Sequence, residues 1–268
     1  MRPLLCLLLL TAAPCLAAAG KGESAKTKSV EAIAAEIRPS VVKVMQVGRD
    51  GVDGLGAGFV VSADGLIATN LHVIGEARRL EIETGDGQKY EVVEVTATDA
   101  HWDLALLRVA KKGLKPLKLA NSDAVVQGQP IVAMGNPEGL AFSVVDGVVS
   151  AFPDVVNDIP MIRVAVPIEK GNSGGPLLNR KGEVIGLLTL KSARTENLGF
   201  AMPVNELKHL IAKPNPVPMD RWLTIGVLNP KVWKPLLGAR WTQHAGIIKA
   251  ATTGTGFGGR SLCLSMTE

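Results

Sequence analysis

Short apolar runs separated by turn residues fill most of the chain, and no long helical pattern interrupts them. The first series of runs is Val41–Val47, Gly58–Ser62, Leu66–Thr69, Leu80–Thr84, Glu91–Thr96 and Leu104–Val109. The second series is Pro130–Met134, Ser143–Ser150, Ile162–Val166, Pro176–Leu178, Val184–Leu190 and Gly199–Met202. Short strands with frequent turn signals are typical of all-β proteins. The two series predict two six-stranded antiparallel β-barrels packed together, with a cleft between them.

Turns and two short helices complete this pattern. Three glycine-containing turns are predicted at Asp53-Gly54, Asp64-Gly65 and Gly85-Asp86-Gly87. Ser29 is placed to cap a helix that runs to Ile37 and stops at Pro39. A second helix from about Asn205 to Ala212 would close the domain.

A serine between glycines, in Gly171-Asn172-Ser173-Gly174-Gly175, is the first sign of chemistry. Glycines let the backbone fold tightly enough to direct several N–H groups at one point. A hydroxyl beside such a cluster combines a nucleophile with an oxyanion site, which acyl transfer requires. Turns and linkers use the same residues, so the motif needs a base and an acid to become a catalytic prediction.

Two upstream segments supply a base and an acid. His72 ends a strand–turn–strand pattern that starts near Gly56, and Asp103 stands at the mouth of the apolar run Leu104–Val109. Taken alone, a histidine at a strand end is usually an ordinary residue, and an aspartate at a strand start is usually a turn or cap residue. The order His72, Asp103, Ser173 is, however, that of the chymotrypsin-like Ser-His-Asp triad.

Five segments together carry a family resemblance: those around His72, Asp103 and Ser173, Gly135-Asn136-Pro137, and Gly199–Asn205. They closely resemble the HtrA-like (Deg-type) trypsin-like serine proteases, over roughly residues 30–212. The resemblance implies a chymotrypsin/trypsin-like fold, with a protease domain over 41–212 and barrels at about 41–112 and 125–203. It also implies a serine endopeptidase.

In such a site His72 takes the proton of Ser173, and Asp103 accepts a hydrogen bond from the other ring nitrogen of the histidine. The resemblance places Thr189 where a hydroxyl braces the aspartate. It assigns the oxyanion hole to the backbone of Gly171, Asn172 and Ser173.

The expected substrate pocket consists of Pro167, Ile168, Leu190, Lys191 and Ser192. In trypsin-like folds the residue six before the nucleophile lies at the base of the S1 pocket, and here it is the uncharged Pro167. A strict preference for Lys or Arg at P1 is therefore not expected, and small or medium apolar P1 residues are. Lys191 departs from the apolar residues common in relatives.

Asn172 stands where digestive relatives carry an aspartate that pairs with a newly freed N-terminus. An ammonium group buried there would have no counter-charge, which is costly. We therefore expect activity without zymogen cleavage, with any regulation coming from the segment Gly139–Asp158.

Residues 1–19 read as a signal peptide, with Arg2 before the apolar run Leu4–Leu10 and small residues before Gly20. The run is too short for a bilayer span, so no stable membrane span is expected after cleavage. A lipoprotein anchor at Cys15 is the alternative, which the preceding Pro14 disfavours. Cleavage would leave Cys263 as the single cysteine and so exclude an intramolecular disulfide. The expected location is periplasmic or secreted.

Three further segments complete the predicted organisation. Residues 20–40 form a polar leader and the short helix, and 213–221 a Pro-rich linker. The segment 222–268 has no assigned fold and is too short for the PDZ domain that many HtrA-like proteases carry. One interpretation is the start of a truncated β-sandwich domain.

The net charge of +4 is spread along the chain, without a basic block with interleaved aromatics, which disfavours nucleic-acid binding. No cluster has metal-ligand spacing, and no cofactor or metal is expected. The expected partners are polypeptide substrates, in the family's pattern unfolded or damaged proteins, and a homotrimer is a candidate assembly. The alternatives are a chaperone-like or scaffold module with minor proteolysis, and a protease dedicated to one partner.

Overall fold

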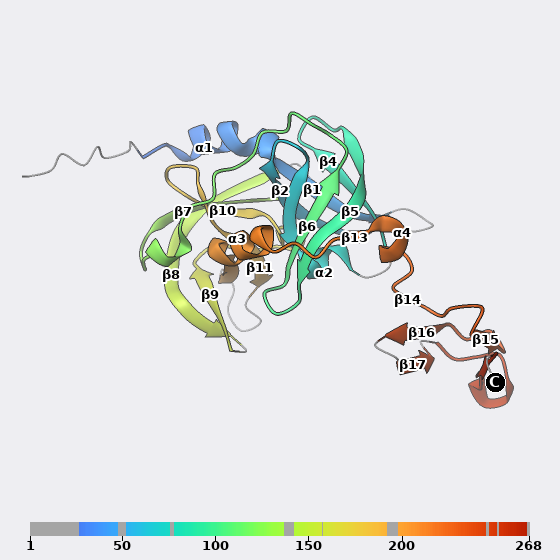
Figure 1. Ribbon diagram of the computed structural model, residues 1–268. Helices are drawn as coiled ribbons and strands as arrows, with labels where there is room; N and C mark the ends of the chain where they lie inside the picture. Colours follow the sequence, from blue (N-terminus) through green and yellow to red (C-terminus); the bar gives the residue numbers. More distant parts are fainter. Residues whose placement is uncertain are drawn as a thin grey trace, which may run out of the picture.

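The computed structural model describes residues 27–47, 52–75, 78–136, 142–156, 158–191, 198–244, 247–250 and 252–266. In this part of the chain two antiparallel β-barrels lie side by side (Figure 1). The predicted all-β fold with two six-stranded barrels is confirmed. The predicted signal peptide, 1–19, lies outside the described residues.

The first barrel follows the first series of apolar runs. Its strands are β1 (Val41–Val47), β2 (Val52–Ser62), β3 (Leu66–Asn70), β4 (Arg79–Thr84), β5 (Lys89–Asp99) and β6 (Leu104–Val109). They are arranged in the order β5-β4-β1-β2-β3-β6, and the sheet closes because β6 also pairs with β5.

The second barrel follows the second series. Its strands are β7 (Pro130–Gly135), β8 (Ser143–Val156), β9 (Ile159–Val164), β10 (Pro176–Asn179), β11 (Val184–Lys191) and β12 (Gly199–Pro203). The order is β10-β11-β12-β9-β8-β7, and the pairing of β10 with β7 closes the barrel.

Strands β3 and β6 and the middle of β2 are buried on both faces, which explains their continuous apolar runs. Successive side chains of a strand point to opposite faces. In β2, Phe59 packs in a cluster that both barrels share, whereas the next residue, Val60, packs inside the first barrel. In β6, Leu106 and Leu107 divide in the same way. One face of these strands therefore fills the barrel, and the other face forms the seam between the barrels.

Short helices lie against the barrels. They are α1 (Val30–Ile37), η1 (Arg38–Ser40), α2 (Leu71–Ile74), η2 (Ser122–Ala124) and α3 (Val204–Ala212). Ser29 caps α1 as predicted, since its hydroxyl accepts a hydrogen bond from the N–H of Ala32 at 3.2 Å. Ile33 of α1 and Leu207 of α3 are buried in the shared cluster, so both helices help to hold the barrels together.

The predicted turn at Asp53-Gly54 is wrong, because both residues lie in β2 and Gly54 pairs with Gln46 of β1. A Cβ atom on Gly54 would lie 2.9 Å from Cδ of Gln46. The glycine therefore makes room for a neighbouring side chain rather than for a turn. At the other end of the fold, β8 continues past its predicted end at Ser150 and pairs with β9 as far as Val156.

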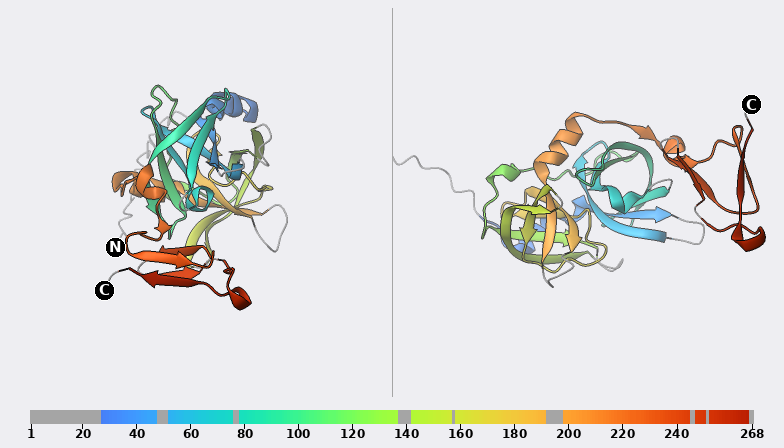
Figure 2. Two further views of the ribbon diagram at one scale, coloured as in Figure 1. Left: turned by 90° about the vertical axis from the view of Figure 1, so that its right-hand side faces the viewer. Right: turned by 90° about the horizontal axis from the view of Figure 1, so that it is seen from below.

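After α3 the chain returns to the first barrel. There β13 (Val217–Pro218) pairs with β5, and Trp222 at the end of α4 (Met219–Trp222) is buried inside the barrel. The remaining elements are β14 (Gly226–Val227), β15 (Trp233–Leu236), β16 (Trp241–His244), β17 (Ile247–Ala250), η4 (Phe257–Gly259) and β18 (Leu262–Ser265). These strands form two small sheets that lie apart from both barrels (Figure 2). The division of the chain into a protease domain, linker and C-terminal segment stays a prediction.

Among the described residues, no helix has the length and apolar character needed to cross a bilayer.

The shared cluster gives a test of how strongly the seam contributes to stability. Phe59 is fully buried there, so Phe59→Ala should lower the free energy of unfolding by about 3–5 kcal/mol through lost burial and a cavity. Val155→Ala is the control, because it truncates a side chain that is 63% exposed. It should change the free energy of unfolding by less than about 0.5 kcal/mol. Urea unfolding curves measure both. Equal effects of the two substitutions would show that Phe59 does not pack as described.

Candidate active site

His72 lies just beyond β3, in the single turn of helix α2. The turn is fixed from the inside, because Val73 and Ile74 are buried and the carbonyl of Val73 accepts a hydrogen bond from Gln46 Nε2 at 2.7 Å. The His72 side chain points the other way and remains 46% exposed. The buried residues Val73 and Ile74 therefore fix the backbone of α2, while the imidazole of His72 stays accessible to solvent.

Asp103 lies in the turn between β5 and β6, with a left-handed backbone conformation (φ 51°). Two bonds fix this turn on the side of α2: the Asp103 carbonyl accepts from the N–H of Leu71 at 3.0 Å and from Asn70 Nδ2 at 2.9 Å. On the other side, Asp99 Oδ1 accepts from the N–H groups of His101 and Trp102. The turn thus carries the carboxylate toward His72 on a backbone held at both ends.

The carboxylate of Asp103 makes three hydrogen bonds. Oδ2 lies 2.6 Å from His72 Nδ1, and Oδ1 accepts from the His72 N–H at 2.9 Å. Oδ2 also accepts from Thr189 Oγ1 at 2.9 Å. With the Asp103 carboxylate as the acceptor, Nδ1 is the donor of this bond, and Nε2 is left for another partner. This is the ring orientation that a base acting at Nε2 requires.

Ser173 lies in a tight loop before β10 that glycines make possible. Gly171 and Gly174 have positive φ values of 100° and 85°. The Ser173 carbonyl accepts from the N–H of Ala57 at 2.8 Å, which ties the loop to the first barrel. A Cβ atom on Gly174 would lie 2.1 Å from the Ala57 carbonyl oxygen, so only glycine fits this approach.

Thr189 connects the two halves of the site. Its hydroxyl donates to Asp103, and its backbone carbonyl accepts from Ser173 Oγ at 3.0 Å. The residue is 3% exposed and lies where the pairing of β11 with β12 shifts between Leu188 and Leu190. The hydroxyl contact is the one that the sequence indicated. The carbonyl contact was not foreseen, because it depends on the local backbone irregularity.

The loop before β10 also presents backbone N–H groups. The N–H of Asn172 donates to the carbonyl of Glu169 at 3.0 Å. Within the described residues, the N–H groups of Gly171 and Ser173 make no backbone hydrogen bond. These two N–H groups, on either side of Asn172, are the donors that the family resemblance assigns to an oxyanion hole.

Asn172 is buried against β7. A Cβ atom on Gly135 would lie 2.3 Å from Asn172 Oδ1, so glycine is required behind the loop. Next to it, the N–H of Asn136 is 3.4 Å from the carbonyl of Gly171. The dipeptide Gly135-Asn136 therefore supports the loop that carries Ser173, which is a structural reason for its place among the sequence motifs.

The expected substrate pocket is only partly described. Ile168 is buried and packs so closely on β12 that a Cβ atom on Gly199 would lie 2.0 Å from its Cδ1. Pro167 is exposed beside it. The backbone of Leu190 and Lys191 forms the end of β11 and pairs with Phe200 and Gly199. Ser192 lies outside the described residues, as do the side chains of Leu190 and Lys191.

One residue of the site was missed by the sequence reasoning. Asn70 is fully buried, and its amide holds the turn of Asp103 from the end of β3. Its position two residues before His72 was the available signal, since a buried polar side chain beside a catalytic candidate needs a partner.

Comparisons with known proteins agree with the two-barrel fold. Residues 56–187 match the family model described as a trypsin-like peptidase domain. "Serine protease HTRA2, mitochondrial" of Bos taurus is 40% identical over 187 residues, which are 65% of this chain and 40% of that protein. "Probable periplasmic serine endoprotease DegP-like" of Pseudomonas fluorescens is 40% identical over 157 residues, 56% of this chain and 33% of that protein. "Serine protease HTRA1" of Xenopus tropicalis is 38% identical over 166 residues, 59% and 35% of the two chains.

The chain spans less than half the length of each of these relatives. The matched family model includes His72, Asp103 and Ser173 and reaches into β11. Residues 56–187 therefore match a trypsin-like peptidase domain, and with its two closed barrels the described domain is similar to the HtrA-like serine proteases.

Proposed function

We propose that this chain is a serine endopeptidase in which Ser173 is the nucleophile, His72 the general base and Asp103 the orienting acid. The observation that carries the proposal is the pair of hydrogen bonds by which the Asp103 carboxylate holds both the ring and the N–H of His72. Thr189 links this carboxylate to the serine hydroxyl. Three separate segments of the chain thus converge on one small region.

The reaction follows from these positions. Ser173 Oγ attacks the carbonyl carbon of the scissile peptide bond while His72 Nε2 takes its proton, and Asp103 stabilises the resulting imidazolium. The imidazolium then gives the proton to the departing amine, leaving an acyl group on Ser173. Water attacks this ester with the same base and releases the acid product. The N–H groups of Gly171 and Ser173 stabilise the oxyanion in both steps.

Ser173 has to turn before it reacts, because its hydroxyl donates to the Thr189 carbonyl in the structure. A change between staggered rotamers about the Cα–Cβ bond redirects the hydroxyl toward the cleft. Catalytic hydrogen bonds in free enzymes are often not yet aligned and tighten only when substrate binds. The free structure is therefore compatible with the proposed role of Ser173.

The proposed substrates are polypeptides, in particular unfolded or damaged proteins, and the proposed location is outside the cytoplasm. The names of the relatives support a location outside the cytoplasm in part. The DegP-like relative is described as periplasmic, whereas the HTRA2 relative is described as mitochondrial. Export of this chain rests on its N-terminal sequence, with Arg2 and the apolar run Leu4–Leu10.

The central test is Ser173→Ala. It should lower kcat on a casein-type unfolded substrate by about 10⁴- to 10⁶-fold, because the bond-forming atom is removed. Labelling with a fluorophosphonate probe, followed by peptide mapping, should modify Ser173 in the unchanged protein and nothing in the variant. Thermal unfolding of the variant serves as the control for folding. Comparable turnover by both proteins would refute the proposal and favour a binding or scaffold role.

The carboxylate gives a second prediction. Asp103→Asn should lower kcat by about 10⁴-fold, because an amide facing His72 Nδ1 favours the wrong tautomer of the ring. Asp99→Asn is the matched control, since Asp99 lies in the same turn and its role as acceptor for two N–H groups survives in an amide. Steady-state kinetics distinguish the two residues. A larger loss from Asp99→Asn would identify a different acid.

A third prediction concerns specificity. Cleavage after Val, Ala, Ile or Leu should outpace cleavage after Lys or Arg, because Pro167 provides no negative charge and Ile168 is a buried apolar wall. A cationic P1 side chain would lose hydration there without gaining a partner. A set of peptides that differ only at P1 measures kcat/KM directly. Preferential cleavage after basic residues would contradict this picture of the pocket.

A further inference from the structure

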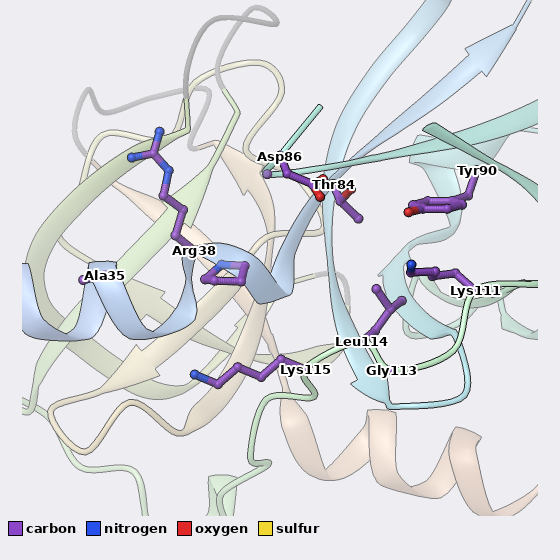
Figure 3. Close-up of a pocket in the computed structure, with 11 residues that line it drawn as sticks. Ala35, Arg38, Thr84, Asp86, Tyr90, Lys111, Gly113, Leu114 and Lys115 are labelled. Atoms are coloured by element: carbon purple, nitrogen blue, oxygen red, sulfur yellow. Dashed lines mark hydrogen bonds between the residues drawn. The ribbon is translucent and has the colours of Figure 1, made fainter. Parts of the chain in front are cut away.

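A cavity of about 470 Å³ opens on the first barrel, outside the candidate active site. Its walls come from three places: the junction of α1 and η1, the turn between β4 and β5, and the segment that follows β6. Figure 3 shows Arg38 on one side, Tyr90 and Lys111 on the opposite side, and Lys115 below. The volume lies within the range of about 300–1,000 Å³ found for sites that hold small ligands.

Positive charge dominates the lining. Arg38, Lys111 and Lys115 all belong to it, against one carboxylate, Asp86. Among the described residues no salt bridge involves Arg38 or Lys111, and Lys111 Nζ lies 5.7 Å from the centre of the Tyr90 ring. Lys115 Nζ donates to a backbone carbonyl, that of Glu36, at 3.0 Å. These cations therefore remain available to an anionic ligand.

Asp86 offsets only one of these charges; its carboxylate is bonded within its own turn and also lies near Lys111. Its Oδ1 accepts from Thr84 Oγ1 at 2.5 Å and from the N–H of Gln88 at 3.2 Å. The hydroxyl of Thr84 is the main reason that the pKa of Asp86 lies below its ordinary value, followed by the N–H of Gln88. Glu36 of α1 does not line the cavity; it pairs with Lys28 and also lies near Lys115. The lining thus keeps a positive excess of two charges, three cations less one anion.

Apolar surface lies between the charges. Leu114 and the ring of Tyr90 are half-buried, and Pro39 adds an exposed apolar wall. A small inorganic anion would leave this surface uncovered. A chain that carries carboxylates next to apolar side chains would cover it and also meet the cations. Arginine in particular binds carboxylates with two parallel hydrogen bonds.

We propose that this cavity is an accessory site that binds an acidic segment of a polypeptide, with its carboxylates at Arg38, Lys111 and Lys115 and an apolar side chain at Leu114 and Tyr90. The site would hold a substrate while another part of the same chain enters the active site. This second statement rests on the proposed peptidase function, whereas the binding itself does not.

The cavity is separate from the residues of the proposed triad. None of its lining residues contacts His72, Asp103 or Ser173. In Figure 1 the helix α1 and the strand β4 lie at the top of the molecule, whereas α2, which carries His72, lies toward the bottom. Substitutions in the cavity can therefore change binding without touching the chemistry.

Binding is tested in the Ser173→Ala protein, which cannot cut the probe under the proposed mechanism. The probe is a fluorescein-labelled peptide rich in Glu and Leu, and its control is the same peptide with Gln in place of Glu. Fluorescence anisotropy should show binding of the first peptide, weakened by added salt, and much weaker binding of the second. Equal binding of the two peptides would overturn the proposal.

Two sets of variants locate the site. Arg38→Ala/Lys111→Ala should weaken binding about three- to tenfold, as expected for two exposed charge contacts. Lys181→Ala/Lys234→Ala removes the same charge from exposed positions elsewhere and should have little effect. Asp86→Asn keeps an acceptor for Thr84 but removes the anion, so it should strengthen binding, a gain that misfolding cannot produce. Weakening by both double variants alike would overturn the proposal.

Kinetic measurements on protein that keeps Ser173 test the accessory site and the proposed peptidase function independently. For a peptidase substrate with an acidic tail, Arg38→Ala/Lys111→Ala should raise KM about three- to tenfold and leave kcat unchanged, and a substrate without the tail should be unaffected. A protein that binds the acidic peptide but cleaves nothing would refute the peptidase and leave the binding site in place. Cleavage with equal KM values for both substrates would refute the role of the cavity in holding substrates.

Discussion

The docking of the two barrels is the constraint on which the candidate site depends. The first barrel supplies His72 and Asp103, and the second supplies Ser173 and Thr189. Besides the apolar packing, two hydrogen bonds of the site cross the seam: the N–H of Ala57 donates to the Ser173 carbonyl, and Thr189 Oγ1 donates to the Asp103 carboxylate. Neither barrel holds a complete set of reactive groups. The apolar cluster that both barrels share therefore positions the chemistry as well as stabilising the fold.

Much of this arrangement could be predicted from the sequence, because several strands, such as β3 and β6, are buried on both faces and appear as continuous apolar runs. Val41–Val47 and Leu104–Val109 were predicted with the bounds that the structure shows. The glycines around Ser173 were equally informative, since Gly171 and Gly174 do adopt the positive φ values that only glycine takes easily. Local backbone requirements leave a direct signature in the sequence.

Contacts between distant segments leave no such signature. The sequence predicted a turn at Gly54. Glycine is needed there because the side chain of Gln46 lies against it on the paired strand, and this contact depends on the register of the two strands. The amide of Asn70 on the Asp103 carbonyl was missed for a similar reason. The cationic cavity was missed as well, since Arg38 and Lys111 come to line one cavity only in the folded chain.

The bond between Thr189 and Asp103 joins residues 86 positions apart, whereas that between His72 and Asp103 spans 31. Contacts of short separation form early, and distant ones carry a larger entropic cost of loop closure. On a growing or refolding chain, His72 and Asp103 can therefore meet while Ser173 is still part of an unformed barrel. Under the proposed mechanism, such an incompletely folded copy would lack a complete triad and could not yet cut its neighbours.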